Sequence, residues 1–264
     1  MKLINTSFKN NSLPLAIAII KKIAPFLPNL KNHIIISRTA CLGNDLLRIC
    51  KKNGKKMVAI NQQKVRVDLF LKWLKDSPRP KSREIKKYFR DPAIFEHLKQ
   101  QEKLPWLKIK KIKYLTMDSF AELTDKKFTN IKDKWSFCCH FEDLYLTDEF
   151  KNNFKIEGVL PLEKLEESYR AFFTWFEKKY PEKNVYFIHY PSLFDVRLEY
   201  KERGTAILQI MQKISTEKPY VKNIFLTEEE ITEKIKTDPF PYHYNNEVYQ
   251  KLSEKLKKFI TINP

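Results

Sequence analysis

The segment LEKLEESYRAFFTWFEKK, residues 162–179, is followed five residues later by VYFIH, residues 185–189. Apolar residues recur in the first part at helical spacing, which predicts an amphipathic helix with one face on a core. The second part is a short continuous apolar run, typical of a strand that is covered on both faces. A helix followed by such a strand is the repeating unit of α/β sheets.

The same alternation continues in both directions along the chain. Further short apolar runs predict strands at residues 33–36, 57–60, 112–117 and 221–226. Further helical patterns cover residues 42–52, 204–214 and 247–260. Strands that alternate with helices require parallel crossovers. We therefore predict a three-layer α/β/α fold with a five-stranded, mostly parallel sheet.

Two regions interrupt this alternation. Residues 65–101 are mostly helical and charged, and we interpret them as a helical insertion between the second and third strands. Residues 130–159 are aromatic and show no regular pattern. Long loops in α/β folds often build the ligand site above the strand ends. The prediction is a single α/β domain, residues 1–264, with the 65–101 insertion inside it.

The chain is strongly basic, with 50 Lys and Arg residues against 32 Asp and Glu residues and a formal charge of +18. Only nine of the basic residues are Arg, so the excess is lysine. The alternatives are a solvated lysine surface and attraction to an anionic partner, such as an acidic polysaccharide, coenzyme A, a membrane surface or nucleic acid. Nucleic-acid binding would require aromatic side chains that stack on nucleobases, placed among the basic residues. Trp106 beside Lys108 is the local sign of such an arrangement.

Cysteine and glycine usage narrows the choice of compartment and cofactor. Four cysteines without CxxC spacing, and no apolar run of the ~18 residues that span a bilayer, are typical of a reduced cytoplasmic protein. Contact with the inner face of the membrane remains compatible with the charge. Cys138-Cys139-His140 has no second ligand cluster, so we expect no metal site. With four glycines and no glycine-rich phosphate loop, we expect no tightly bound cofactor.

The stretch DPFPYHYNNEVY, residues 238–249, carries the chemistry most directly. Two prolines restrict a loop that holds Asp238 and His243 just before the last predicted helix. A carboxylate and an imidazole in a rigid loop are typical of an acid/base pair for nucleophilic catalysis. The alternative is a structural histidine stacked among the neighbouring aromatic residues.

Residues 162–191, EYKERG at 199–204 and PYHYNNEVY at 241–249 together resemble the SGNH-hydrolase superfamily of esterases and carbohydrate O-acetyltransferases. The last block resembles a branch associated with bacterial surface polysaccharide loci. The resemblance implies an SGNH, flavodoxin-like fold over residues 31–260 apart from the insertion. It further implies acetyl transfer to or from sugar hydroxyls in capsule or other surface polysaccharide synthesis, with a carbohydrate partner and acetyl-coenzyme A as a candidate donor. His243 would be the general base, oriented by Asp238.

The family places its nucleophile in a turn directly after the first strand, where this chain reads SRTACLGND, residues 37–45. Alignment leaves two candidate nucleophiles, Thr39 and Cys41, each of which could lose its proton to His243. Gly43 and Asn44, with the backbone amides from Ala40 onward, would supply the oxyanion hole.

A second-choice nucleophile, Ser119, follows the third strand beside Asp118, and both could line the site. The departure from serine in the first turn keeps other classes open. One is a catalytically atypical glycan-binding or glycan-transferring member of the same fold. Another is a nucleic-acid-binding protein, a hypothesis based on the positive charge of the chain alone.

Overall fold

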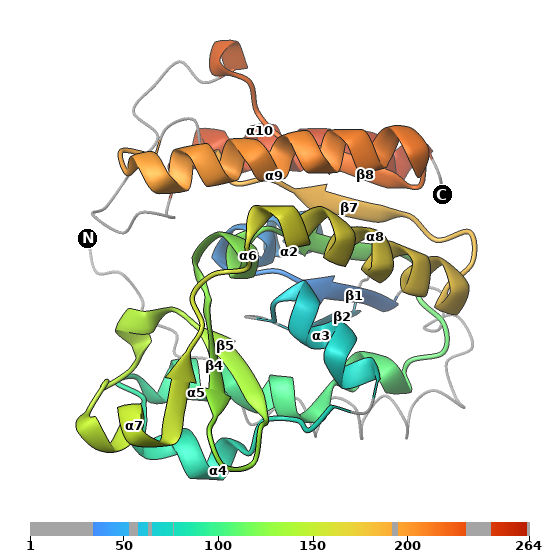
Figure 1. Ribbon diagram of the computed structural model, residues 1–264. Helices are drawn as coiled ribbons and strands as arrows, with labels where there is room; N and C mark the ends of the chain where they lie inside the picture. The colour runs from blue at the N-terminus through green and yellow to red at the C-terminus, as the bar shows by residue number, and fades with distance from the viewer. Residues whose placement is uncertain are drawn as a thin grey trace.

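The computed structural model describes residues 34–52, 58–62, 65–75, 77–191, 195–230 and 244–262. Its main feature is a five-stranded parallel sheet (Figure 1). The strands are β1 (Ile34–Arg38), β2 (Val58–Asn61), β3 (Leu115–Asp118), β7 (Val185–Ile188) and β8 (Val221–Ile224). Their spatial order, β2-β1-β3-β7-β8, is the 2-1-3-4-5 order of flavodoxin-like doubly wound sheets. The predicted fold class and all five predicted strands are therefore confirmed.

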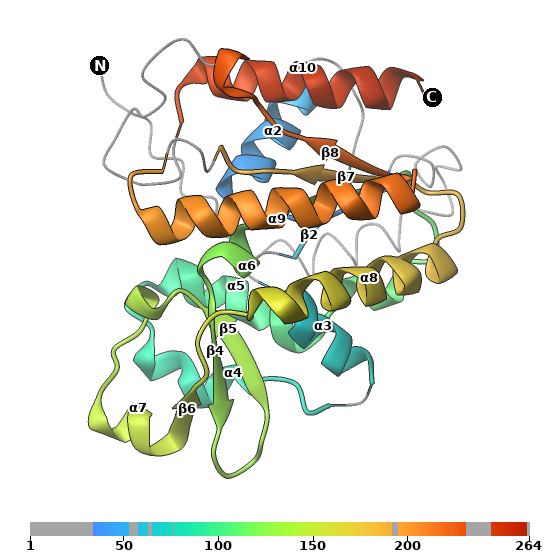
Figure 2. The ribbon, with the colours of Figure 1, turned by 45° about the horizontal axis from the view of Figure 1, so that its top comes forward.

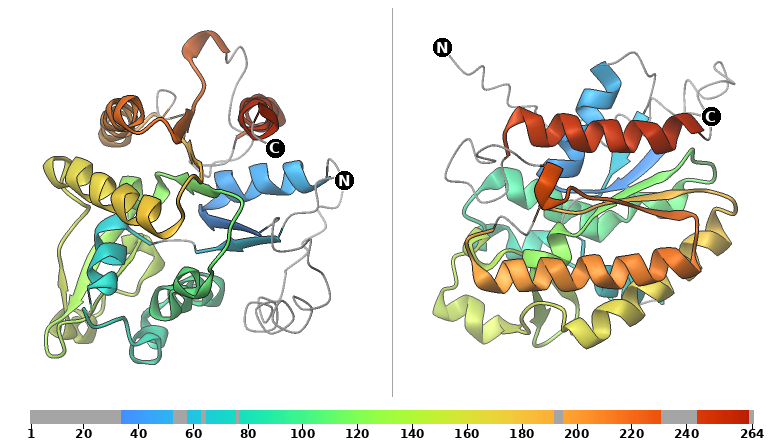
Figure 3. Two further views of the ribbon diagram at one scale, coloured as in Figure 1. Left: turned by 90° about the vertical axis from the view of Figure 1, so that its right-hand side faces the viewer. Right: turned by 90° about the horizontal axis from the view of Figure 1, so that it is seen from above.

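Helices cover both faces of this sheet (Figure 3). On one face α2 (Cys41–Lys52) packs against α10 (Asn246–Ile262), which crosses over it (Figure 2). On the other face α8 (Leu162–Lys179) packs between α9 (Leu198–Glu217) and α3 (Val67–Leu74). The periodicity of α8 explains its place, because its apolar stripe is fully buried in the core. The members of that stripe are Leu165, Tyr169, Phe172, Phe173 and Phe176.

A second, three-stranded antiparallel sheet lies below α6 (Phe120–Thr124) in Figure 1. It consists of β4 (Lys126–Asn130), β5 (Ser136–Cys139) and β6 (Phe154–Ile156), in the order β5-β4-β6. Short helical segments complete this part: η4 (Phe141–Asp143) and α7 (Asp148–Asn153). The interpretation of residues 130–159 as irregular was wrong, because most of this sheet lies within them.

The 65–101 region is helical, but its helices divide between two cores. The side chains of α3 enter the main core, while α4 (Ser82–Ile85), η2 (Lys86–Tyr88) and α5 (Pro92–Lys103) cover the second sheet. Between α5 and β3 lies a further short helix, η3 (Pro105–Lys108), and η6 (Glu228–Glu230) follows β8. Tyr88, Phe89 and Phe95 pack with aromatic residues of the second sheet and form a separate apolar cluster. Two segments distant in sequence therefore build one small added unit beside the main sheet.

Candidate functional site

The turn between β1 and α2 is held by a set of buried hydroxyl and amide groups. The Thr39 hydroxyl lies 2.9 Å from the Ser37 hydroxyl, which also accepts a 3.0 Å hydrogen bond from Thr116 on β3. The backbone N–H of Thr39 donates to Asn61 at the end of β2, and Asn61 donates back to the Thr39 carbonyl. Thr39 is 1% exposed. Its side chain is therefore a structural member of this turn.

Gly43 and Asn44, the predicted oxyanion residues, lie in the first turns of α2. A Cβ atom on Gly43 would lie 2.4 Å from both Cβ and Cγ2 of Thr39, so only glycine allows this close approach. The Asn44 side-chain oxygen accepts a 2.7 Å hydrogen bond from Asn61, so the donor group of Asn44 is its Nδ2. The first intrahelical bond of α2 is donated by Asn44 to Ala40, so the amides from Cys41 to Gly43 precede it.

Asp118, at the end of β3, closes the turn from the other side. Its carboxylate accepts hydrogen bonds from the backbone N–H of Ala40 at 2.7 Å and of Phe120 at 3.1 Å. Burial raises the pKa of Asp118 to about 7, against the effect of these two bonds and of Arg38. Asp118 is 2% exposed. The Ala40 amide that we assigned to the oxyanion hole is thus engaged, which limits the candidate donors to those after it.

A buried ion pair supports this turn from below. Arg38 makes a two-pronged contact with Glu122 of α6, with both nitrogen–oxygen distances at 2.7 Å. Glu122 also accepts from the Val67 N–H at 2.8 Å and from the Tyr169 hydroxyl at 3.1 Å. Burial disfavours the charged guanidinium, but Glu122, Tyr169 and Asp118 together outweigh burial, so the pKa of Arg38 is raised. The pair joins β1, α6, α3 and α8 directly beneath the candidate site.

Cys41 is the accessible candidate in this turn. It is exposed at the start of α2, directly after the carboxyl end of β1. Tyr190, which follows β7, is buried, and that burial together with Asp118, Cys41 and Tyr244 raises its pKa well above the ordinary value. The rings of Tyr190 and Tyr244 lie 6.4 Å apart, centroid to centroid. The electrostatic neighbours of the thiol therefore include Tyr190, which follows β7, and Tyr249 of α10.

The two remaining predicted residues, Asp238 and His243, lie outside the described residues. The described part of their sequence block begins at Tyr244, whose ring also packs edge-on against Tyr249 of α10 at 6.5 Å. Burial and the neighbouring Asp45 and Cys41, in part, raise the pKa of Tyr249 to about 12. Tyr244 thus brings the end of the chain beside the turn after β1.

Ser119, the second-choice nucleophile, is 3% exposed and directly precedes α6. Its carbonyl accepts the first hydrogen bond of that helix, from Leu123. The structure thus brings Thr39, Cys41, Gly43, Asp118 and Ser119 to one edge of the main sheet. Of their side-chain functional groups, the Cys41 thiol alone belongs to an exposed residue. An accessible thiol beside helix N-terminal amides is an arrangement that can perform nucleophilic acyl chemistry.

Three other expectations concerned metal, membrane and nucleic acid. Within the described parts of the chain, no group of three or more His, Cys, Asp or Glu residues could hold a metal ion. Over the same residues, none of the helices is long and apolar enough to span a membrane. The stacking role suggested for Trp106 was wrong, because its ring is fully buried against Phe70.

Several residues of the site were missed at the level of sequence. Asn61 organises the turn, and its signal was a polar residue at the end of a predicted apolar strand. Tyr190 follows the strand of residues 185–188 in the same way. Arg38 and Glu122 carried no signal, because charged residues in sequence do not reveal that they are buried.

Comparisons with known proteins add little to this geometry. No family model matches the chain, and no curated protein matches it significantly. Among solved structures, a similar one is a GDSL-like lipase from Bacteroides thetaiotaomicron VPI-5482. The two chains are 10% identical, and the match covers 94% of this chain and 99% of that chain with a TM-score of 0.46. A likeness at this level carries no argument about activity, and the fold assignment follows from the strand order itself.

Proposed function

We propose that this protein catalyses acyl transfer at the edge of the main sheet, with Cys41 as nucleophile and His243 as general base. The observation that carries the proposal is the exposed thiol at the start of α2, whose electrostatic neighbours are Tyr190 and Tyr249, with the ring of Tyr244 packed against both tyrosines. His243 directly precedes Tyr244 in the sequence, which makes it the candidate base for that thiol. Asp238 is the proposed orienting carboxylate.

In the proposed reaction the Cys41 thiol gives its proton to His243 and its sulfur attacks the carbonyl carbon of the acyl donor. The oxyanion that forms is stabilised by the early amides of α2 and by Nδ2 of Asn44. When the tetrahedral intermediate collapses, the leaving group of the acyl donor takes the proton from His243 and departs. The acyl group remains on Cys41 as a thioester. An acceptor hydroxyl, or water, then loses its proton to His243 and takes the acyl group from sulfur.

We further propose an acetyl group as the acyl group and a sugar hydroxyl of a surface polysaccharide as the acceptor. The support is the resemblance of residues 241–249 to the corresponding block of carbohydrate O-acetyltransferases. The positive surface favours acetyl-coenzyme A as donor and an anionic glycan as acceptor. A cytoplasmic location, at the inner face of the membrane, is proposed on the spacing of the four cysteines, which form no CxxC pair, and on the positive charge of the chain.

The test is an acetyl-transfer and ester-cleavage assay of Cys41→Ala and His243→Ala, with mass spectrometry of the acylated protein. Loss of the nucleophile should lower kcat/KM at least about 1000-fold and abolish the acyl adduct. Thr39→Val is the matched control, because it removes the rival hydroxyl and keeps the shape of the side chain. Full activity in folded Cys41→Ala, or an adduct on Thr39, would contradict the assignment.

A second candidate function is glycan binding without catalysis. It is favoured by the hydroxyls of Ser37 and Thr39, which are buried and bonded to each other in the turn where the family carries its serine. Under this reading the protein would bind a glycan and would stay inert toward an acylating probe. The same mass-spectrometric experiment, combined with a glycan-binding measurement, separates the two functions.

A further inference from the structure

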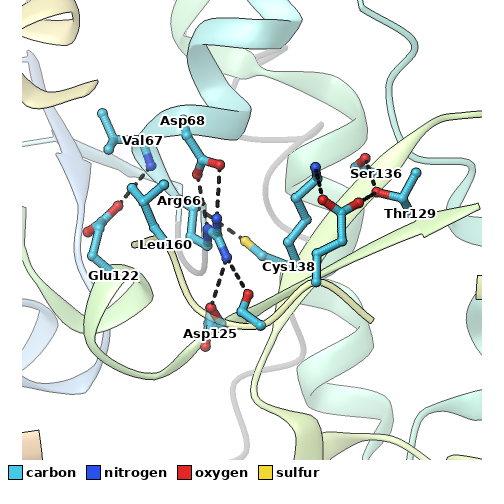
Figure 4. Close-up of polar contacts among 12 residues, drawn as sticks. Arg66, Val67, Asp68, Glu122, Asp125, Thr129, Ser136, Cys138 and Leu160 are labelled. Atoms are coloured by element: carbon cyan, nitrogen blue, oxygen red, sulfur yellow. Dashed lines mark hydrogen bonds and ion pairs between the residues drawn. The ribbon is translucent and has the colours of Figure 1, made fainter. Parts of the chain in front are cut away.

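A pocket of about 270 Å³ lies away from the candidate site, between the end of α3 and the β4–β5 hairpin of the second sheet. One wall is apolar and comes from Leu69 and Trp73 of α3, both of which are buried. The hydroxyls of Thr129 on β4 and Ser136 on β5, which are 2.8 Å apart, also line the pocket (Figure 4). The lining thus includes both apolar side chains and hydrogen-bonding groups.

Three lysines line this pocket: Lys72 from α3, Lys127 from β4 and Lys134 from the hairpin. The acidic residue that lines it is Glu157, whose carboxylate lies 2.8 Å from the Lys127 ammonium group and accepts from Thr129. Over the described residues, neither Lys72 nor Lys134 has a carboxylate within ion-pair distance. Three positive charges against one negative charge leave the pocket with an excess of two.

The lysine charges also oppose one another. Partial burial of the otherwise exposed Lys72 side chain, followed by the charge of Lys127, lowers its pKa, against the opposing effect of Asp68 and Glu157. The nearest acid on α3, Asp68, is held by Arg66 in a two-pronged contact with distances of 2.9 and 3.0 Å, as Figure 4 shows. Arg66 is in turn fixed to the carbonyls of Asp125 and Gly158. An anion placed between Lys72 and Lys127 would relieve a repulsion that Asp68 and Glu157 offset only in part.

We propose that this pocket binds the phosphate group of a small phosphorylated molecule. A phosphate monoester carries close to the two negative charges that would neutralise the excess, whereas a carboxylate carries one. Lysine binds phosphate as a point charge, and the hydroxyls of the hairpin supply further hydrogen bonds. The wall of Leu69 and Trp73 would contact the organic part of the ligand. The volume is close to the lower limit of small-molecule sites, which fits a compact ligand.

The experiment is isothermal titration calorimetry of the full chain with inorganic phosphate, glycerol 3-phosphate and acetate at one fixed ionic strength. One saturable site is expected, with glycerol 3-phosphate binding more tightly than inorganic phosphate and acetate at least about tenfold more weakly. Tight binding of inorganic phosphate without binding of the ester would limit the pocket to the free ion and overturn the proposal of a phosphorylated molecule. Absence of saturable phosphate binding would overturn the site itself.

Charge-matched variants separate the pocket from the general lysine surface. Lys72→Gln/Lys134→Gln removes two exposed pocket charges and should weaken binding at least about tenfold. Lys178→Gln/Lys258→Gln removes two exposed charges elsewhere and should bind as the wild type does. Glu157→Gln should have the opposite effect and increase the affinity for the phosphate ester severalfold, because it removes the negative charge that competes with the ligand. Equal affinities in the two double variants, or no gain in Glu157→Gln, would contradict the proposal.

This inference is independent of the acyl-transfer proposal. Cys41 is not among the residues that line the pocket. Failure of phosphate binding would therefore leave the thiol chemistry untouched, and an inactive Cys41→Ala protein should still bind the phosphate ester with wild-type affinity.

Discussion

The turn after β1 and the lysine pocket beside β4 both concentrate polar side chains, but they differ in how the charges are paired. In the turn, Arg38, Asp118 and Glu122 are almost fully buried, and each carboxylate is bonded to backbone or side-chain donors. In the pocket, Lys72 and Lys134 are exposed, and Glu157 forms an ion pair with Lys127 and accepts a hydrogen bond from Thr129. The first region uses its polar groups to fix the backbone, whereas the second retains an excess of one sign.

This difference in charge pairing predicts that the turn contributes to the stability of the fold and that the pocket contributes to ligand binding. A buried pair contributes little when both partners are present, yet the loss of one partner leaves an uncompensated charge in the interior. Exposed charges are screened and contribute little to stability, but they remain able to attract a ligand. Substitutions in the turn should thus change folding, and substitutions in the pocket should change binding.

The largest expected effect comes from Glu122→Gln. It leaves the buried Arg38 guanidinium without its counter-charge, which should lower the free energy of unfolding by about 3–5 kcal/mol. Urea unfolding monitored by circular dichroism measures this loss of free energy of unfolding. The double variant Arg38→Met/Glu122→Met should recover part of the loss, because neither charge is then buried alone.

The matched surface control is Glu217→Gln, which breaks the exposed two-pronged contact with Arg170. Its unfolding midpoint should stay within the error of the wild-type value, because an exposed pair is screened by solvent. If Glu122→Gln and Glu217→Gln had equal effects, burial would not be what distinguishes the two pairs.

Asp118 supplies a pH-dependent version of the same comparison. Its pKa is about 7 in the folded protein against an ordinary 3.8, so the folded protein binds more protons than the unfolded chain between these values. The free energy of unfolding should therefore fall as pH rises from about 4 to about 7, by at most roughly 4 kcal/mol. Asp118→Asn, which cannot ionise, should lose this slope.

The measurement is the free energy of unfolding of wild type minus that of Asp118→Asn, obtained from urea titrations at several pH values. The wild type alone is not sufficient, because His189 also titrates in this range. Burial lowers the pKa of His189 to about 4, so its contribution to the free energy of unfolding is lost as pH falls from about 6.5. Lys134→Gln in the lysine pocket should keep the wild-type slope, since it changes no buried carboxyl group. Identical slopes in wild type and Asp118→Asn would show that Asp118 is ionised throughout this range.

The two regions also differ in how far the sequence predicts them. The strands β1, β3 and β7 in the centre of the main sheet are almost fully buried, so they stand out as mostly apolar runs, and α8 was located to the residue. The strands of the second sheet are three to five residues long, and two of them, β4 and β6, mix lysine with phenylalanine. Their covering side chains, such as Tyr88 and Phe95, come from a distant segment, which local patterns do not reveal.

A similar limit applies to the candidate site. The carboxyl ends of parallel strands meet at one edge, which is why Thr39, Cys41 and Asp118 could be grouped before the structure was available. The hydrogen bonds that hold the turn could not be foreseen. Asn61 reaches Thr39 from the neighbouring strand, and Asp118 binds the Ala40 amide across the sheet. Such partners depend on register and burial, which composition does not specify.

The smallest expected effects come from two glycines, Gly43 in the turn after β1 and Gly158 after β6. Gly43→Ala should destabilise the turn by about 1–3 kcal/mol through overlap with Thr39, as overpacking of a core does. Gly158, beside β6, has no atom within 4 Å of an added Cβ but has a φ of +72°. Gly158→Ala should cost about 1 kcal/mol through backbone strain alone.

Asparagine separates these two causes, because it adopts the left-handed conformation more readily than alanine but is larger. Gly158→Asn should therefore be closer to wild type than Gly158→Ala, while Gly43→Asn should be at least as unstable as Gly43→Ala. Thermal and urea unfolding of the four variants measure both differences. Recovery by asparagine at position 43 would mean that conformation, and not contact with Thr39, requires the glycine, and the tight packing of the turn after β1 would lose its main support.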